Sequence, residues 1–242
     1  MERSVFERLK ELETAHWWFI ARRRIIGRVI ETLALPSPAR VLEVGCGTGG
    51  NLKLLCQFGE LKAMELDEPA RIYASEQSGL IIEGGALPHD LPYPPASFDL
   101  VCAFDVIEHV DDDGGSVAAL AALLAPGGVL LTTVPAYAWM WSRHDELHHH
   151  KRRYRLKDYR RLFEAAGLKV ERASYFNTLL FPLAVAQRLV KKWLRLKSPD
   201  DAMPSQSLNR SLEGVFGAER HWLAARDFPF GLSILLAARK AG

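Results

Sequence analysis

Strand-like and helix-like patterns of apolar residues alternate along most of the chain. The strand-like runs are apolar at nearly every position, whereas the helix-like segments space their apolar residues three or four apart. Seven runs are expected as strands: 39–45, 61–66, 80–84, 97–106, 129–135, 169–176 and 231–240. Helices are expected at 24–35, 51–58, 69–78, 116–124, 156–166 and 208–225. Strands that are apolar throughout are buried on both faces, so the pattern predicts an α/β fold with a parallel sheet between two helical layers.

The domain organisation follows from the spacing of these runs. Residues 1–242 are expected to form one domain, with residues 1–35 as an N-terminal helical lid region. About fifty residues separate the last two strands, and residues 177–227 are therefore predicted to be a helical insertion. The insertion begins with an apolar-then-basic helix and continues through the linker SPDDAMPSQS.

Composition and charge narrow the classes of partner. The chain has 242 residues, 48% of them hydrophobic, and a net charge of +2, so no general basic field favours nucleic acid. The three cysteines show neither metal-ligand spacing nor even pairing, which favours reduced thiols in a cytoplasmic protein. The N-terminus lacks the apolar core of a signal peptide, and no run is long enough to span a bilayer. Membrane contact is expected to be peripheral, at the inner face, if it occurs.

A glycine-rich turn marks the expected ligand site. GCGTGG at 45–50 follows the first strand and opens a helix, and Glu65 closes the second strand. Ligands of open parallel sheets bind at the carboxyl ends of the strands, where backbone N–H groups converge. Taken alone, the turn also fits an enzyme that binds a nicotinamide or flavin dinucleotide.

The wider pattern distinguishes between these cofactors. VLEVGCGTGG at 41–50, Glu65, LPYPPASFDLVCAFDVIEHV at 91–110 and LLAPGGVLLTTVP at 123–135 together resemble the class I S-adenosylmethionine (SAM)-dependent methyltransferases. The chain is most similar to the group that includes the ubiquinone-biosynthesis O-methyltransferases. The resemblance implies a Rossmann-like seven-stranded sheet, mostly parallel with an antiparallel last strand, and SAM as cofactor.

The resemblance also implies roles for individual residues. Gly45 and Gly47 would let the backbone approach the cofactor, Glu43 would accept a hydrogen bond from its ammonium group, and Glu65 would bind the ribose hydroxyls. Gly85 stands where relatives place an acid for the adenine, so that contact is expected either to be missing or to move to Asp90 or to backbone. The expected cofactor-binding residues are Glu43, Gly45, Cys46, Gly47, Gly49, Glu65, Leu66, Ala86, Leu87, Asp105 and Val106.

The segment FDVIEHV raises the question of a metal ion. Asp105, Glu108 and His109 would share one face if the segment were helical, and these donors suit Mg²⁺ or Mn²⁺. Ubiquinone-type O-methyltransferases use a similar E-x-x-E-H segment to hold a divalent ion. Many relatives carry the Glu-His pair without a metal, so the interpretation without a metal is favoured. His109 is as good a candidate for a general base or an acceptor-orienting residue.

Two features point to an apolar acceptor. Trp17 and Trp18 precede the first helix, where they could line the acceptor site or form an aromatic core cluster. The helix at 179–196 has Arg188, Lys191, Lys192 and Arg195 on one face and apolar residues on the other, which is typical of a helix on anionic lipid. Packing of its apolar face on the domain is the more common alternative. The loop Asp/Asn-Pro-Pro-aromatic, which relatives that methylate amino groups of DNA and protein use, does not follow the fourth strand, and no Pro-Cys nucleophile is present. The favoured classes are therefore O- or C-methylation, or N-methylation of a small molecule.

The basic loop, SRHDELHHHKRRY at 142–154, follows the fifth strand and should therefore face the acceptor. His144 or His148 is a candidate base with Asp145 as its orienting partner, and Arg152, Arg153 and Tyr154 could bind an anionic acceptor group. A loop that only closes the pocket is an equal alternative. Neighbouring histidines on an extended chain alternate faces, so a dedicated zinc site is a minor hypothesis.

These expectations combine into one functional hypothesis with alternatives. The chain is expected to be a SAM-dependent methyltransferase (EC 2.1.1.-) that acts on a small, hydrophobic or lipid-linked acceptor. A SAM-binding protein without catalysis that docks a partner is one alternative. An RNA methyltransferase is another, with Arg22–Arg24 and Lys151–Arg161 as a phosphate track. The near-neutral total charge makes nucleic acid the less favoured partner.

Overall fold

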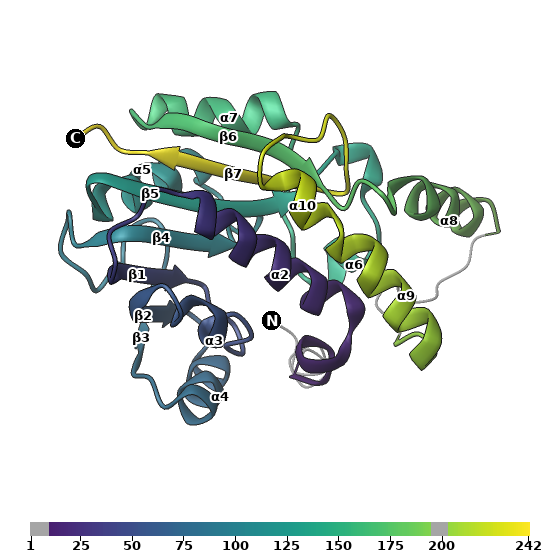
Figure 1. Cartoon of the computed structure of the whole chain (residues 1–242), viewed down its shortest axis with the longest axis horizontal. Helices are drawn as coiled ribbons and strands as arrows, with labels where there is room; N and C mark the ends of the chain where they lie inside the picture. Colours follow the sequence, from purple (N-terminus) through teal and green to yellow (C-terminus); the bar gives the residue numbers. More distant parts are fainter. Residues whose placement is uncertain (1–9, 195–202) are drawn as a thin grey trace.

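The computed structural model describes residues 10–194 and 203–242, apart from the side chains of Lys191, Lys192 and Leu194. The proposed basic positions Lys191, Lys192 and Arg195 therefore lie outside what is described. In the described part, seven strands form one sheet in the order β3-β2-β1-β4-β5-β7-β6 (Figure 1). The strands are β1 (Ala39–Val44), β2 (Gly59–Glu65), β3 (Ile82–Gly84), β4 (Phe98–Phe104), β5 (Leu124–Pro135), β6 (Lys169–Phe176) and β7 (Ser233–Arg239).

Strand direction confirms the predicted fold class. Strands β1 to β5 pair in parallel, whereas β7 lies antiparallel between β5 and β6. The order along the sheet reverses between β1 and β4, which are hydrogen-bonded neighbours. In open α/β sheets the crevice at such a reversal, beyond the carboxyl ends of the strands, is where ligands bind. The glycine turn lies at this point.

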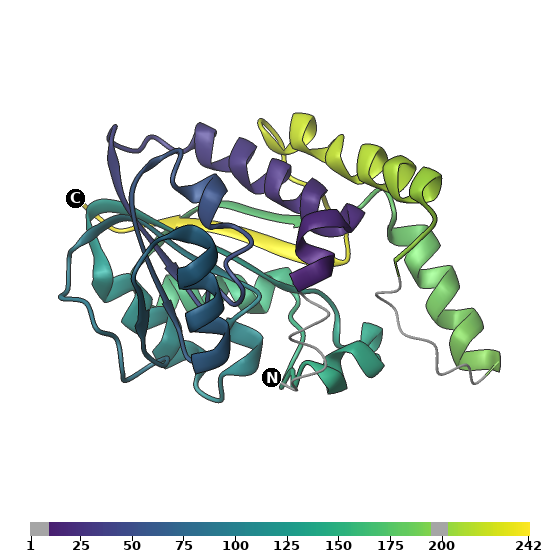
Figure 2. The same cartoon turned by 90° about the horizontal axis from the view of Figure 1, so that it is seen from below.

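Helices cover both faces of the sheet (Figures 1 and 2). The helices are α2 (Trp17–Thr32), α3 (Leu52–Leu55), α4 (Glu68–Ser78), α5 (Asp113–Leu123), α6 (Arg143–Leu147), α7 (Leu156–Ala165), α8 (Phe181–Leu194), α9 (Gln206–Gly217) and α10 (Glu219–Leu223), with 3₁₀ turns η1 (Ile107–His109) and η2 (Ala138–Met140). The prediction at 51–58 was too long, because only Leu52–Leu55 is α-helical. α2 begins at Trp17, where the preceding His16 side chain accepts a hydrogen bond from the Trp18 N–H.

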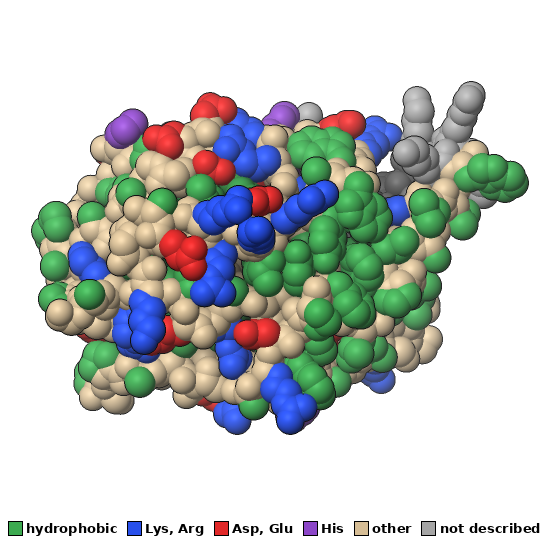
Figure 3. Space-filling model, turned by 90° about the horizontal axis from the view of Figure 1, so that it is seen from above, with side chains coloured by type: hydrophobic (Ala, Val, Ile, Leu, Met, Phe, Trp, Pro, Cys, Tyr) green, Lys and Arg blue, Asp and Glu red, His purple; other side chains and the backbone are tan. Residues whose placement is uncertain are grey.

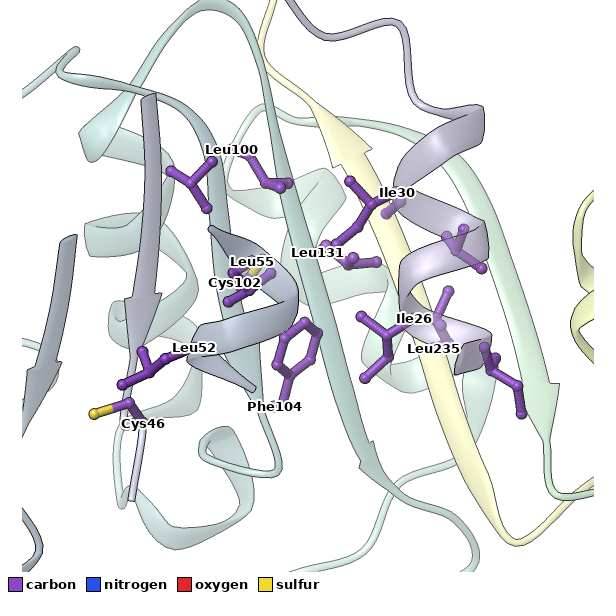
Figure 4. Packing of buried hydrophobic residues seen from close by; sticks show 14 of the residues in the cluster. Ile26, Ile30, Cys46, Leu52, Leu55, Leu100, Cys102, Phe104, Leu131 and Leu235 are labelled. Atoms are coloured by element: carbon purple, nitrogen blue, oxygen red, sulfur yellow. The ribbon is translucent and has the colours of Figure 1, made fainter. Parts of the chain in front are cut away.

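Two apolar layers hold the helices on the sheet. On one face, Ile26 and Ile30 of α2 pack with Leu131 and Leu235 of the sheet (Figure 4). On the other, α5 and α7 cover a cluster that includes Phe163. Side chains of successive strand residues alternate between the two layers. Burial of both sheet faces explains why the central strands β4, β5 and β7 are apolar at most positions, whereas the edge strand β6 carries Lys169, Glu171 and Arg172.

The insertion between β6 and β7 carries α8, α9 and α10, and its structure is described except for residues 195–202. Glu219 fastens its start, since this buried carboxylate accepts hydrogen bonds of 2.7–2.8 Å from the N–H groups of Asn177, Thr178 and Leu179. α9 and α10 pack along α2, whereas α8 projects from the body of the domain (Figures 1 and 2). Among the described residues, no helix has both the length and the apolar character that crossing a membrane requires.

Candidate active site

The glycine loop, residues 45–50, lies at the carboxyl end of β1 beside the end of β2. Gly45 has a φ of +68°, and a Cβ there would lie 2.7 Å from Val106 Cγ2. Gly47 also has a positive φ of +57°, but a Cβ there would meet no atom within 4 Å. The first glycine therefore permits a close contact within the protein, and the second leaves open space over the loop.

The Glu65 carboxylate is oriented by two backbone donors. Its Oε2 accepts a hydrogen bond from the Gly47 N–H at 2.7 Å, and its Oε1 accepts one from the Asp67 N–H at 2.9 Å. Leu66, next along the chain, exposes 73% of its surface although it is apolar. This arrangement places a carboxylate and an uncovered apolar side chain at the crevice.

Glu43 is a buried carboxyl group that is only half satisfied. Its Oε1 accepts a hydrogen bond of 2.8 Å from the Asn51 side chain, whereas Oε2 has no hydrogen-bond partner in the described chain. Burial raises the pKa of Glu43 to about 8, against the opposing effect of Asn51. A cation beside Oε2 would satisfy this oxygen and stabilise the ionised form.

The backbone after β3 explains why Gly85 replaces the expected acid. A Cβ on Gly85 would lie 2.6 Å from both the Asp90 carbonyl oxygen and Met64 Cε, so no side chain fits there. Ala86 and Asp90 exchange two backbone hydrogen bonds of 2.7 and 2.8 Å, which close the turn that carries Leu87. Whether Ala86, Leu87 or Asp90 contacts an adenine stays a prediction.

Asp105 lies just beyond β4 and is held from two sides. Its φ of +56° is unusual for a residue with a side chain. The Arg22 guanidinium donates to Asp105 Oδ2 at 2.6 Å, and Thr133 donates to Oδ1 at 3.1 Å. The residues that follow, Ile107–His109, form a 3₁₀ turn, and the segment FDVIEHV contains no α-helix. Asp105 therefore faces Arg22 and Thr133, while Glu108 and His109 lie near His150 instead.

The N-terminal segment reaches the glycine loop. The Thr48 hydroxyl donates a hydrogen bond to the Glu13 carboxylate, which also lies close to Gly50. The Arg23 guanidinium donates to the Glu13 carbonyl oxygen at 2.7 Å. Sequence reasoning assigned a lid to this region but missed Glu13, because an acid in a charged helix has no distinguishing local signal.

The basic loop, residues 142–154, is organised around one buried carboxylate. Asp145 Oδ1 accepts from Arg153 Nε at 2.7 Å and lies 2.9 Å from His150 Nδ1, and Oδ2 accepts from the Ser142 N–H. Burial alone would raise the pKa of Asp145, but the His150 and Arg153 hydrogen bonds hold that pKa well below its usual range. The contacts of Arg153 are therefore with Asp145 and the Ala136 carbonyl.

Four histidines gather beside this carboxylate. The His144 and His148 rings are 4.2 Å apart, and the His109 and His150 rings are 4.7 Å apart. Burial and then the neighbouring His144 lower the pKa of His148 to about 3. Burial and then His150 lower the pKa of His109 to about 4. Both rings are thus neutral near pH 7, and such low pKa values make them weak general bases.

Two further basic-loop residues that are expected to bind the acceptor, Arg152 and Tyr154, contact an acidic side chain of the protein instead. Arg152 lies 2.8 Å from Asp113, and the Tyr154 hydroxyl donates to the same carboxylate at 2.9 Å. Tyr154 is buried, and its backbone pairs with the end of β5. These contacts give both residues a structural role, and binding of an anionic acceptor by them stays a prediction.

The two candidate tryptophans have different surroundings. Trp17 packs edge-on against Phe216 of α9 at 5.8 Å between ring centroids, as the aromatic-cluster alternative describes. Trp18 stacks near the Arg22 guanidinium, 4.9 Å from its ring centroid. Trp18 therefore lies next to the Arg22–Asp105 pair at the ends of β4 and β5, where an acceptor could meet it.

An aromatic rim that sequence reasoning missed lies beyond β5. Tyr137 stacks on Tyr175 and Trp139 with centroid distances of 5.1 and 5.7 Å, and Phe181 of α8 lies 5.8 Å from Tyr137. We use "aromatic rim" for Tyr137, Trp139, Tyr175, Phe181 and Phe230. These residues come from four separate segments, so only the fold brings them together. Trp139 remains 59% exposed.

Exposed apolar side chains continue from the rim along α8. Leu183, Leu189 and Val190 are exposed by 60%, 60% and 51%, and Trp193 by 83%. Hydrophobic side chains gather over a broad area on the side of the molecule that carries α8, next to a group of Lys and Arg side chains (Figure 3). Leu189, Val190 and Trp193 are therefore not packed on the domain, contrary to the more common alternative for this helix.

Comparisons with known proteins agree with this geometry. A family model described as a methyltransferase domain matches residues 17–173. A probable S-adenosylmethionine-dependent methyltransferase of Mycobacterium tuberculosis is 33% identical over 129 residues, which cover 52% of this chain and 46% of that protein. A ubiquinone biosynthesis O-methyltransferase of Xanthomonas campestris is 37% identical over 108 residues, covering 42% and 45%. The chain thus spans about half the length of these relatives.

Solved structures share the fold at low sequence identity. A chain from the complex with the Trm112 methyltransferase activator of Haloferax volcanii superposes with a TM-score of 0.66 at 18% identity, covering 99% of this chain and 95% of that one. Geranyl diphosphate C-methyltransferase of Streptomyces coelicolor gives 0.61 at 14% identity, covering 88% and 78%. With the family model matching residues 17–173, the chain belongs to the methyltransferase-domain family of class I SAM-dependent methyltransferases.

Proposed function

We propose that this protein transfers a methyl group from SAM to a small, hydrophobic acceptor by O- or C-methylation. The main support for SAM as the methyl donor comes from Glu43. One oxygen of this carboxylate has no hydrogen-bond partner in the described chain, and the carboxylate lies beside an open glycine loop. SAM carries an ammonium group and a sulfonium, and its ribose offers two hydroxyls. The oriented Glu65 carboxylate can accept hydrogen bonds from both hydroxyls, while Glu43 Oε2 can accept one from the ammonium. The residues therefore fit this cofactor.

Methyl transfer from a sulfonium is an in-line displacement that depends mainly on placing the nucleophile. The protein must hold acceptor and cofactor in a line and, for a hydroxyl acceptor, remove one proton. Asp105, fixed by Arg22 and Thr133, lies at the end of β4 where the two ligands would meet. His144, on the basic loop, remains the proposed base, with His109 and His148 as weaker candidates.

The aromatic rim supports an apolar acceptor. Tyr137 and Trp139 of the rim follow the carboxyl end of β5, and Trp139 is largely uncovered. Apolar pockets with few polar groups are typical of sites for small hydrophobic ligands. The exposed apolar residues of α8 extend the same surface, which favours a lipid-linked acceptor presented at a membrane.

The phosphate track of the RNA alternative is largely neutralised by acids. Arg22 pairs with Asp105 and Arg24 pairs with Glu213. Paired cations in the second part of the track are Lys151, Arg152, Arg153, Arg160 and Arg161. Charges that already meet carboxylates release few counterions on binding nucleic acid, so RNA is not favoured.

Transfer of label from methyl-labelled SAM tests the proposal. Hydrophobic phenols, prenylated phenols, fatty acids and polar amines should be supplied as separate acceptor panels. We expect label in an apolar hydroxyl or carbon acceptor and none in the polar amines. Stoichiometric SAM binding without transfer to any panel would favour the non-catalytic alternative.

Vesicle flotation tests the membrane arm separately. We expect the protein to float with anionic vesicles and to lose this property when Leu189 and Trp193 are replaced by Glu. If the protein stays at the bottom of the gradient, membrane contact through α8 is ruled out, but the proposal of an apolar acceptor is unaffected.

A further inference from the structure

Three side chains with metal-binding atoms converge behind Asp105. Glu108 and His109 belong to η1, and His150 comes from the basic loop. One ligand atom from each residue lies within 4.8 Å of the other two. His150 is about forty residues away from Glu108 and His109 in sequence, so the docking of the basic loop on η1 creates the group. The Lys151 N–H donates to the Glu108 carbonyl at 2.8 Å and fixes that docking.

The Glu108 carboxylate lacks any partner inside the described chain. Its side chain is 0% exposed, and neither carboxylate oxygen has a hydrogen bond. Burying an unpaired carboxylate is unfavourable, and proteins normally satisfy such a group by a hydrogen bond, an ion pair or a metal. A cation between the three side chains would supply the missing partner for this carboxylate.

Both imidazoles are held as metal ligands usually are. His150 Nδ1 lies 2.9 Å from Asp145 Oδ1, so its proton belongs on Nδ1 and the lone pair of Nε2 is left for another partner. Asp145 in turn is paired with Arg153. His109 makes a hydrogen bond to the backbone of His149. Partners of this kind orient metal-binding histidines and raise their basicity.

The donor set selects the class of ion. Two imidazole nitrogens and one carboxylate favour a borderline first-row ion such as Zn²⁺ or Co²⁺ over Mg²⁺ or Ca²⁺. In a tetrahedral zinc site with bonds of about 2.0–2.2 Å, ligand atoms lie roughly 3.4 Å apart. A small inward movement of the three side chains reaches that spacing. Asp105 is not needed, because its carboxylate is already held by Arg22 and Thr133.

We propose that Glu108, His109 and His150 form a binding site for a divalent transition-metal ion that fastens the basic loop to the end of β4. Water or one of the nearby rings of His144 and His148, 5.9 and 6.0 Å from His150, completes the coordination. The ion thereby stabilises the wall of the acceptor side. Its binding does not depend on methyl transfer.

Titration of chelator-treated, metal-free protein tests the site. Co²⁺ is followed by its visible absorption, Zn²⁺ by calorimetry, and Mg²⁺ serves as the hard-ion comparison. We expect one equivalent of Co²⁺ or Zn²⁺ to bind, with Mg²⁺ at least a hundredfold weaker. His109→Gln and Glu108→Gln should each weaken Co²⁺ binding at least tenfold. His149→Gln, which alters an exposed histidine of the same run, should leave it unchanged.

Several results would overturn the proposal. These are no stoichiometric Co²⁺ or Zn²⁺ binding, a preference for Mg²⁺, or losses that follow His149→Gln as closely as His109→Gln. Near-ultraviolet circular dichroism and SAM binding by each variant report whether it is folded. If Glu108→Gln does not fold, the partly exposed His109→Gln decides the outcome. Failure of SAM binding in the wild type would count against the proposed function and not against the metal site.

Discussion

The Arg22 guanidinium lies 2.6 Å from Asp105 Oδ2 and 2.8 Å from Thr133 Oγ1. This contact joins α2 to the ends of β4 and β5, and Arg22 is almost fully buried between Trp18 and Phe104. The helix of the N-terminal region is thereby fixed at the point where cofactor and acceptor would meet. An arginine that looks like one of three surface cations in the sequence is thus part of the candidate site.

Loss of this pair should destabilise the domain and loosen the site. We expect Arg22→Met to lower the free energy of unfolding by about 3 kcal/mol, because it leaves Asp105 without its buried cation. Urea unfolding measures the change. Arg28→Met is the matched control in the same helix, since its pair with Glu31 is about half exposed on both sides and should contribute less than about 0.5 kcal/mol. Equal effects of the two substitutions would contradict the structural role of Arg22.

SAM binding should release a proton near neutral pH. The raised pKa of Glu43, about 8, means that the carboxyl is mostly protonated at pH 7 in the free protein. The cofactor's ammonium favours the ionised form, so affinity should rise from pH 6 to pH 8 and level off above it. Calorimetry in buffers of different ionisation enthalpy counts the proton. Glu43→Gln should abolish the release, and a wild-type titration with no proton release would contradict the assignment.

The Asp145–Arg153 pair should organise the basic loop. Asp145→Asn leaves the buried Arg153 without its counterion, and we expect a loss of about 3 kcal/mol in the free energy of unfolding. Asp158→Asn, in an exposed pair with Arg161, should change it by less than about 0.5 kcal/mol. Thermal and urea unfolding of both variants provide the comparison. If Asp145→Asn leaves the free energy of unfolding unchanged, the loop folds without its central carboxylate and the prediction is wrong.

The aromatic rim should act on the acceptor and not on stability. Trp139 is 59% exposed, so Trp139→Ala should preserve the unfolding midpoint but raise the KM for an apolar acceptor by tenfold or more. Trp222→Ala on α10 changes a comparably exposed tryptophan outside the rim and should leave that KM unchanged. Steady-state kinetics at saturating SAM measure the difference. An unchanged KM for Trp139→Ala would place the acceptor elsewhere.

The buried histidines should make the metal-free protein sensitive to acid. The lowered pKa of His148, about 3, means that it contributes stability above its unfolded pKa of about 6.5, which is lost as pH falls toward 3. His148→Gln should therefore flatten the decline in unfolding free energy below pH 6.5. His221→Gln, at an exposed position, should leave the slope unchanged. If the unfolding free energy falls equally steeply with pH in the wild type, His148→Gln and His221→Gln, then His148 is not a neutral, partly buried ring in the folded protein.

The order of elements and the cofactor end of the site could be predicted because their signals are local. Continuous apolar runs mark β1, β4 and β5, and the glycine loop requires its glycines for backbone geometry. The acceptor end could not be predicted, because its contacts join distant segments. Asp145 meets His150 and Arg153 only because residues 143–147 fold as a helix, and Tyr137 meets Phe181 only across the insertion.

The FDVIEHV segment shows why spacing alone misleads. Residues 105, 108 and 109 would share the face of an α-helix, but Asp105 adopts a left-handed φ and the following turn is 3₁₀. Glu108 and His109 are consequently grouped with His150 of the basic loop. Sequence periodicity carries no information on that partner.

Calorimetric titration of the purified protein with SAM tests directly whether the glycine loop, Glu43 and Glu65 form a SAM site. We expect one site with micromolar or tighter affinity. Glu65→Ala should weaken binding at least tenfold, because the Gly47 and Asp67 N–H groups position that carboxylate for the ribose. Glu60→Ala, on an exposed position of the same strand, should bind SAM as the wild type does. The contradicting result is a protein that does not bind SAM, or that binds NAD more tightly.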